Sequence, residues 1–257
     1  MKKLFLTIAA FFLLTCHANA ATLFESFDVR IGIFDAAKVS ISYTLGPNSA
    51  FFAEIKTSGV FDTFYSFMAQ YNTSGTFEGN RYTTKGYTQT TKSSSHMRTK
   101  TLMFDEKGLL TKRISTKDDF ENAFDVAKQN PLPDAYDMQT VLLMMLKKLQ
   151  TENTCALNKT VFNSKKIYHI SIEDEGAVDY QNKKSPYSGK ARRCHAFIHQ
   201  EKVEKGDLLW QVSSERSIIF YVLTDPKTGL FFVPEVNIPS TPLGDLKAFA
   251  TNYKIKD

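Results

Sequence analysis

The chain has 257 residues, a formal net charge of +5 and 42% hydrophobic residues, and it includes 21 Phe and 11 Tyr. This aromatic content, with only 8 Pro, argues against a disordered chain and favours β-sheet. The net charge is too small to indicate binding to nucleic acid.

The first twenty residues have the three parts of a secretory signal peptide. Lys2 and Lys3 form a positive start, residues 4–14 form a short apolar run, and Ala18-Asn19-Ala20 forms a cleavage site. We therefore expect cleavage after Ala20, a periplasmic location, and a formal charge of +3 once Lys2 and Lys3 are removed. The apolar run is too short to span a membrane, and the mature chain holds no other candidate for a transmembrane segment.

Cys16 offers an alternative, in which the cysteine of a lipoprotein carries the lipid. Leu13-Leu14-Thr15 lacks the small residue that usually stands just before such a cysteine, so we favour simple cleavage. Residues 21–257 contain no internal repeat, low-complexity tract or Gly/Ser linker, and we expect them to form one exported domain.

Alternating apolar and polar residues predict antiparallel strands through the first half of the mature chain. The first hairpin is predicted to join residues 27–33 to residues 39–45 through a turn at Asp35-Ala36-Ala37. Further strands are predicted over residues 52–57, 69–77, 81–91, 95–104 and 109–115. One or two helical turns are predicted over 60–68, and a charged loop is predicted over 117–133.

The segment from Asp134 to Gln150 is the one long stretch with a helical period. Asp134 is predicted to cap the helix, and Asp137 falls in the first turn, where the helix dipole favours negative charge. The residues of one apolar face are Met138, Val141, Leu142, Met145, Leu146 and Leu149. Leu143 and Met144 lie off that face, so the middle of the helix is apolar all round and is predicted to be buried.

Beyond this helix, strands are predicted over residues 160–173, 191–200, 208–213, 217–223, 231–238 and 246–255. A turn or bulge is predicted at 164–166, a polar loop over 174–186, and a turn over 225–229. The predicted fold class is therefore α+β and mostly antiparallel. We expect one strongly curved sheet that wraps the helix.

Two cysteines remain in the mature chain, Cys155 and Cys194, and an even pair in an exported protein predicts a disulfide. Closing a loop of about 40 residues would stabilise the fold by roughly 3–4 kcal/mol. A metal site is the alternative, because His195 and His199 lie nearby in the sequence. On a strand these two histidines would stand about 13 Å apart, which is too far to share one metal ion.

The chain contains no nucleophile elbow, phosphate-binding loop, dinucleotide-binding glycine pattern or zinc-protease motif. The four mature histidines are His96, His169, His195 and His199, and we expect them to fill the sheet surface. Glu173, Asp174, Glu175 and Asp179 crowd one segment, where we expect a solvated turn. The alternatives are an acid–base pair or a weak calcium site. We predict no catalytic residue, no metal and no cofactor.

Two basic clusters could instead contact an anionic envelope surface. The residues of the first are Arg81, Lys85, Lys92, Arg98 and Lys100; those of the second are Lys183, Lys184, Lys190, Arg192 and Arg193. The simpler interpretation is a solvated sheet face and loop. Docking to anionic lipid, lipopolysaccharide or a protein partner is the sharper hypothesis, and it predicts binding that weakens with salt.

The second half of the chain resembles the exported proteobacterial proteins of domain of unknown function family 3108. The resemblance extends from about Phe27 to Tyr253. It rests on a stretch after Cys155 (residues 161–168), the Y-x-G-x-A-x-x-C stretch from Tyr187 to Cys194, and Val233-Pro234. Asp137-Met138-Gln139-Thr140 is similar to the family's helix entry, and Gly32-Ile33 to its opening strand. Asn163-Ser164 departs from the family's Asp-Gly, and Ala36-Ala37 from its second hairpin glycine.

This resemblance implies a periplasmic protein without enzymatic activity, built like the open, curved β-barrels of lipoprotein carriers and envelope-stress sensors. Our leading hypothesis is a binding or scaffolding protein for cell-envelope integrity, whose partner is an envelope protein or lipid. One alternative is a carrier of lipid or another apolar ligand, with a pocket lined by Met138, Met144 and Met145. A second alternative is an enzyme that acts on envelope glycan.

Overall fold

The computed structural model describes residues 20–118, 120–124, 135–162, 167–200, 217–241 and 243–256. Within these residues, fifteen strands form a single sheet and two helices accompany it. The strands of the first half are β1 Thr22–Ile31, β2 Phe34–Thr44, β3 Asn48–Thr57, β4 Phe67–Glu78, β5 Arg81–Ser93, β6 Met97–Phe104, β7 Leu110–Lys117 and β8 Phe120–Phe124. Those of the second half are β9 Ala135–Tyr136, β10 Leu157–Phe162, β11 Ile167–Gln181, β12 Ser188–Gln200, β13 Ile218–Thr224, β14 Phe231–Thr241 and β15 Gly244–Lys256.

Strands that are neighbours in the sheet are almost always neighbours in the sequence. The order is β8-β7-β6-β5-β4-β3-β2-β1-β15-β14-β13-β12-β11-β10-β9, so β8 and β9 are the two edges. Pairing is antiparallel, except where β9 lies parallel to β10. The two ends of the domain meet inside the sheet, where β1 pairs with β15. The predicted open, mostly antiparallel sheet is therefore confirmed.

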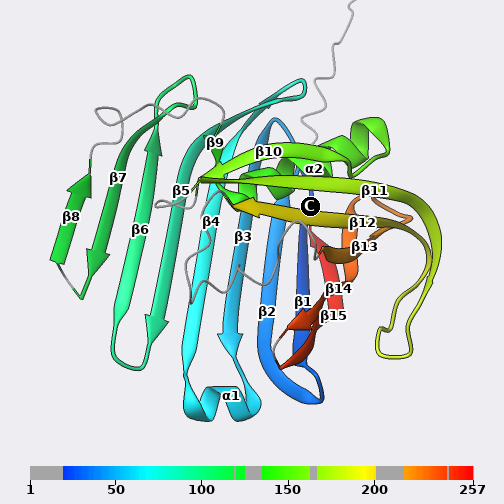
Figure 1. The fold of residues 1–257 in the computed structure, drawn as a ribbon. Helices are drawn as coiled ribbons and strands as arrows, with labels where there is room; N and C mark the ends of the chain where they lie inside the picture. The colour runs from blue at the N-terminus through cyan, green and yellow to red at the C-terminus, as the bar shows by residue number, and fades with distance from the viewer. Residues whose placement is uncertain are drawn as a thin grey trace, which may run out of the picture.

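The sheet curls so far that its two halves face each other. Strands β1 to β8 stand side by side, and β10 to β12 cross in front of β1 to β5 (Figure 1). Helix α2, Met138–Glu152, lies between these two parts and contacts β3, β4, β5 and β10. The predicted central helix thus occupies the concave face of the sheet.

The side chains of α2 are buried on nearly every side, as the sequence predicts. The apolar side chains exposed by 4% or less are Val141, Leu143, Met145, Leu146 and Leu149. Met144, from the other side of the helix, is 8% exposed, whereas Met138 and Leu142 are half-buried. Each large apolar side chain that is fully buried contributes about 1.5–3 kcal/mol to folding, so this helix carries much of the core.

The helix begins at Asp137, later in the chain than the predicted cap at Asp134, which lies outside the described residues. The Asp137 carboxylate accepts a hydrogen bond from the backbone N–H of Thr140 at 2.9 Å, which is the geometry of an N-cap. At the other end Asn153 adopts a left-handed conformation, with φ of 53°, and its N–H donates to the Leu149 carbonyl.

The first hairpin turns earlier than predicted. The turn lies at Gly32 and Ile33, not at Asp35-Ala36-Ala37, which belong to β2. Gly32 has φ of +59°, which glycine adopts without strain, and its N–H donates to the Asp245 carbonyl. Apolar alternation alone therefore placed the turn too late, because Ile33 continues the alternation of Phe27, Val29 and Ile31 into the turn.

Two predicted loops contain strands. Within the predicted loop over 117–133, residues Phe120–Phe124 form β8 and pair with β7. The predicted loop over 174–186 is wrong up to Gln181, because β11 continues through the acidic residues and pairs with β12 as far as Ser188. The predicted turn at 164–166 and the predicted strand over 208–213 lie outside the described residues.

Leu143→Ala tests the burial of α2. We expect a loss of about 2–5 kcal/mol in the free energy of unfolding, because the substitution leaves a cavity where the side chain is 0% exposed. Urea denaturation followed by circular dichroism measures it. Lys147→Ala, on the half-buried side of the same helix, is the control and should change stability by less than about 0.5 kcal/mol.

Candidate functional site

A disulfide between Cys155 and Cys194 is confirmed, and it joins the segment before β10 to β12. Strand β11 lies between these two strands in the sheet, so the bridge ties non-neighbouring segments together. Both cysteines are fully buried. Among the described residues no three His, Cys, Asp or Glu side chains gather closely enough to hold a metal ion.

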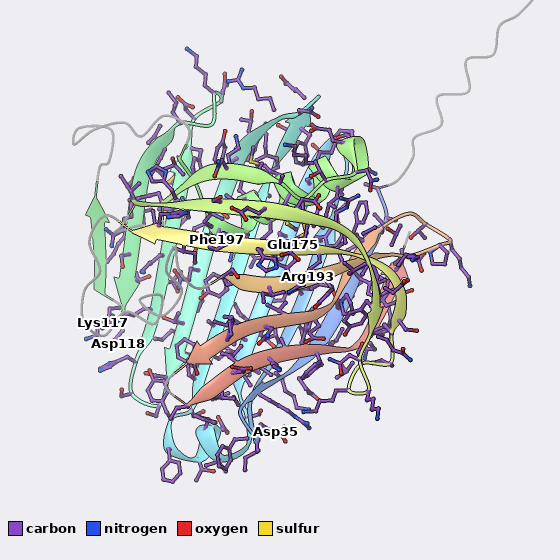
Figure 2. All side chains as sticks on the ribbon, turned by 45° about the vertical axis from the view of Figure 1, so that its right-hand side comes forward. Asp35, Lys117, Asp118, Glu175, Arg193 and Phe197 are labelled. Atoms are coloured by element: carbon purple, nitrogen blue, oxygen red, sulfur yellow. A yellow bond between two sulfur atoms is a disulfide. The ribbon has the colours of Figure 1, made fainter. Side chains whose placement is uncertain are left out.

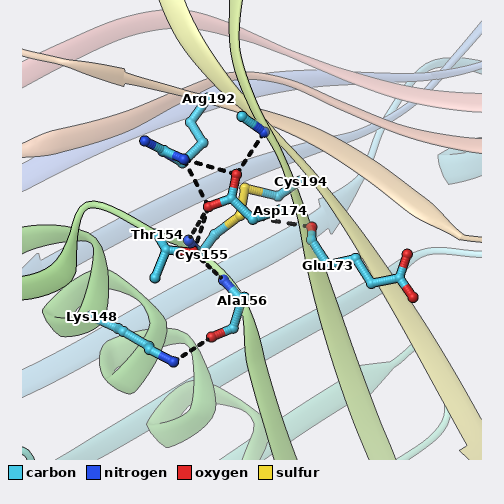
Figure 3. A network of polar contacts seen from close by, with 9 residues as sticks. Lys148, Thr154, Cys155, Ala156, Glu173, Asp174, Arg192 and Cys194 are labelled. Atoms are coloured by element: carbon cyan, nitrogen blue, oxygen red, sulfur yellow. Dashed lines mark hydrogen bonds and ion pairs between the residues drawn. A yellow bond between two sulfur atoms is a disulfide. The ribbon is translucent and has the colours of Figure 1, made fainter.

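Asp174 lies beside the disulfide and receives hydrogen bonds from four residues (Figure 3). Its carboxylate accepts from Thr154 Oγ1 at 2.6 Å, from the Cys155 N–H at 2.9 Å and from the Gly176 N–H at 2.7 Å. Arg192 Nη1 lies 2.9 Å from both carboxylate oxygens. The Asp174 side chain is only 9% exposed, so the predicted solvated turn is wrong at this residue.

The hydrogen bonds decide the charge of Asp174. Burial alone would raise its pKa, but the bonds from Thr154, Arg192 and the two backbone N–H groups outweigh burial and hold the pKa below its usual value. Asp174 is therefore an anion that positions the Cys155 segment and fixes the bulge in β11. These contacts assign it a structural role, in place of acid–base chemistry or calcium binding.

A second buried carboxylate, Asp137, sits inside the barrel at the start of α2. Besides capping the helix, it accepts hydrogen bonds from the hydroxyls of Thr140 and Thr73. Burial raises its pKa, and these bonds oppose that effect. Burial and the nearby Asp137 carboxylate also raise the pKa values of Tyr82 and Tyr87, so both phenols stay protonated.

A third buried carboxylate, Glu25, substitutes for a missing strand neighbour. Strand β14 pairs with β15 only from Glu235 onward, so its first residues lack a backbone partner on that side. The Val233 N–H instead donates to Glu25, with the two oxygens at 3.1 and 3.2 Å. Tyr43 Oη bonds both the N–H and the carbonyl of Phe231.

The closest arrangement to a hydrolytic triad lies on the other face of β11 and β12. His195 Nδ1 is 3.1 Å from Ser217 Oγ, and His195 Nε2 is 3.0 Å from Glu175 Oε1. Glu175 also pairs with Arg193 at 3.2 Å; these two residues lie on the adjacent ribbons labelled in Figure 2. The sequence did not predict these contacts, because the residues that make them are separated along the chain and match no motif.

The basic clusters do not form one surface. Arg81 and Lys85 are exposed on β5, whereas Lys183 and Lys184 lie at the hairpin between β11 and β12. Arg192 is directed to Asp174, on the same side of β12 as the disulfide. Alternation of side chains along β12 places its neighbour Arg193 on the opposite face. Docking by these residues stays a prediction.

Two hollows bear on the predicted apolar pocket. One, of about 410 Å³, lies at the β11–β12 hairpin and is lined by residues 181–183 and 185–188. The other, of about 160 Å³, lies at the end of α2, where Leu149 and Asn153 face Arg192. Neither hollow is lined by Met138, Met144 or Met145, the residues of the predicted carrier pocket.

Comparison with known proteins gives a likeness of fold. No family model matches the chain, and no curated protein matches it. Among solved structures, it is similar to a β-barrel-like protein of domain of unknown function DUF1849 from Brucella abortus, with a TM-score of 0.57 and 8% sequence identity. The match covers 93% of this chain and 99% of that chain. It supports the open β-barrel-like fold, and it does not extend to membership of family 3108.

Asp174→Ala tests the ion pair beside the disulfide. We expect a loss of roughly 3–5 kcal/mol in the free energy of unfolding, because Arg192 and the Cys155 N–H would lose their partner in a buried site. Chemical denaturation measures the change. Asp179→Ala removes an exposed acid from the same strand, whose partner Lys190 is also exposed, and should cost less than about 1 kcal/mol. Equal losses in the two variants would contradict this assignment.

Glu25→Gln tests whether Glu25 acts as the acceptor for the Val233 N–H, through the pH dependence of folding stability. Burial raises the pKa of Glu25 well above its usual value, although the Val233 N–H opposes the shift. The folded protein therefore keeps a proton that the unfolded chain releases above about pH 4.3, and stability falls as pH rises from there. A glutamine still accepts from the Val233 N–H but carries no charge.

We therefore expect Glu25→Gln to be more stable than wild type at pH 8 and equal to it at pH 4, by thermal unfolding. Glu78→Gln, at an exposed end of β4, controls for the change in net charge. A variant that is destabilised at pH 8 would show that the fold requires the carboxylate itself.

Proposed function

We propose that this chain is an exported, non-enzymatic protein of the cell envelope that binds or scaffolds other envelope components through its outer surface. One observation carries the proposal: the concave face, where related architectures would hold a ligand, is filled by α2. The buried residues of that helix pack against β3, β4, β5 and β10. The outer surface is then the part of the molecule that remains for contacts.

The arrangement of three buried acids supports a non-enzymatic role. Asp137, Asp174 and Glu25 each accept hydrogen bonds from the protein itself, and each holds a helix end, a loop or a strand. A catalytic carboxylate needs an oxygen that can reach a substrate, normally within hydrogen-bond distance of the reacting group. The sequence alternative of an enzyme acting on envelope glycan therefore gains no support from these three residues.

Export is supported by the sequence and by the disulfide. The first twenty residues have the pattern of a signal peptide, and disulfides persist chiefly in oxidising compartments such as the periplasm. The resemblance to family 3108 points the same way. Among the described residues, no helix is long and apolar enough to cross a membrane.

The carrier of an apolar ligand is the second candidate, favoured by the flexible methionines on α2. Met144 and Met145 are buried at 8% and 3% exposure, and methionine adapts readily to apolar ligands. The proposals differ in what fills the barrel. A scaffold keeps α2 in place, whereas a carrier must displace part of it.

Native mass spectrometry of protein recovered from the periplasm without detergent separates these two candidates. We expect the mass of the mature chain from Ala21 with its disulfide intact and nothing else bound. A reproducible additional mass of several hundred daltons that is lost on organic extraction would favour the carrier. Met144→Lys should unfold the protein if the helix is only core, whereas a folded variant that loses the additional mass would indicate a pocket.

Deletion of the coding sequence tests the envelope role in cells. We expect the deletion strain to be sensitive to detergent and to large antibiotics, and the wild-type chain to restore tolerance. Leu143→Ala should not restore tolerance if that variant fails to accumulate. A deletion strain with normal tolerance would count against an envelope function, whatever the mass measurement shows.

A further inference from the structure

One end of the barrel exposes large apolar side chains from three separate segments. These are the turn between β1 and β2, helix α1 (Gly59–Phe64) between β3 and β4, and the turn before β15. The Gly32 N–H bonds the Asp245 carbonyl, and the Ser58 N–H bonds the Ala36 carbonyl, so the three segments adjoin. We call six of their residues the apolar rim: Ile33 (88% exposed), Phe34 (50%), Val60 (53%), Phe64 (85%), Tyr65 (59%) and Leu243 (65%).

The turns at the opposite end of the same strands have the usual polar composition. They contain Gly46-Pro47 between β2 and β3 and Gly79-Asn80 between β4 and β5. Turn positions normally take Gly, Asn, Asp and Pro for conformational reasons. The apolar residues of the rim are therefore not a general property of the turns of these strands.

Helix α1 shows that none of the described residues covers the rim. None of its residues is buried, although Val60, Phe61 and Phe64 are three of its six residues. The ring of Tyr65 stacks on that of Phe67, with the ring centroids 6.0 Å apart, but Tyr65 stays 59% exposed. A short helix gains little stability alone, so its apolar side chains would be expected to pack inward unless another surface receives them.

Most charges around the rim are paired within the chain; Asp62 of α1 is an additional acid, which accepts a hydrogen bond from the Thr57 hydroxyl at 2.8 Å. On the strands that carry the rim, Arg30 pairs with Asp35 at 2.8 Å and Lys56 pairs with Glu54 at 2.7 Å. The remaining pairs are Lys38 with Asp28 at 3.7 Å and Lys247 with Asp245 at 3.6 Å. Asp35 marks this end of the molecule in Figure 2. A surface with paired charges does not require a charged partner, which separates the rim from the basic clusters.

We propose that the apolar rim inserts into the interface of a zwitterionic phospholipid bilayer. The rim consists of single side chains that project from three adjoining segments. Such side chains can insert between lipid molecules, because a fluid bilayer needs no complementary shape to receive them. Aromatic side chains such as Phe64 and Tyr65 favour the membrane–water interface. The proposal deepens the proposed function, on which it rests for contact through the outer surface, by naming lipid as the partner.

Flotation with phosphatidylcholine vesicles tests the proposal, using protein recovered from the periplasm. We expect the wild type to float with the vesicles, and the bound fraction to stay constant between about 0.05 and about 0.5 M NaCl. The double substitution Ile33→Ser and Phe64→Ser should lower vesicle affinity by roughly tenfold or more, because each removed side chain loses apolar burial. Both residues are at least 85% exposed, so folding should be unaffected, and a thermal melt checks this.

Met103→Ser is the matched control, because Met103 is 46% exposed on β6, outside the rim. Its vesicle binding should equal that of the wild type. The proposal is overturned if the wild type does not float, if the double variant floats equally well, or if salt or Lys183→Ala with Lys184→Ala removes binding. It is also overturned if the rim mediates self-association, seen as a dimer that the double variant abolishes. A dimer would double the mass in the native spectrum but add no ligand mass, and the other results leave unchanged the spectrum expected for the proposed function.

Discussion

The need to cover a helix that is apolar on all sides organises this protein. A flat sheet can bury only one face of a helix, whereas α2 presents Leu143 and Met144 as well as the stripe through Val141 and Leu149. The sheet therefore bends until β10 to β12 lie across the helix from β3 to β5. The disulfide and Asp174 together connect the segment before β10 to β11 and β12.

Curvature on this scale leaves backbone groups without strand partners, and polar side chains take their place. Glu25 and Tyr43 bind the start of β14, where β15 has diverged. Asp137 binds the Thr140 N–H, which has no partner within α2 because it lies in the first turn. An unpaired backbone group in the interior would cost about as much as a lost hydrogen bond, so each of these residues removes such a penalty. Their burial thus follows from the positions of these backbone groups.

The sequence predicted the features that depend on local periodicity. The helical face of Met138 to Leu149, most strands and the Cys155–Cys194 pair followed from spacing and composition. The features it missed depend on partners distant in the chain. Asp174 is predicted to be a solvated acid because Arg192 and Thr154, its partners, are distant in the chain, and the second half of β11 is predicted to be a loop because its pairing with β12 is not visible in its own sequence. The first turn was misplaced because Ile33, which is exposed, continues an alternation that normally marks a buried face.

The pairing of β1 with β15 has a consequence for how the chain could be connected. Thr22 lies opposite Lys256, so the two ends of the domain are adjacent, while the edges of the sheet fall at β8 and β9, which are close in sequence. Read from β9 through β15 and then from β1 to β8, the sheet is an almost uninterrupted meander. The natural order is thus a circular permutation of that meander, and the last strand must arrive before the first can acquire its second neighbour. Assembly of the two halves is consequently tied to the presence of β15.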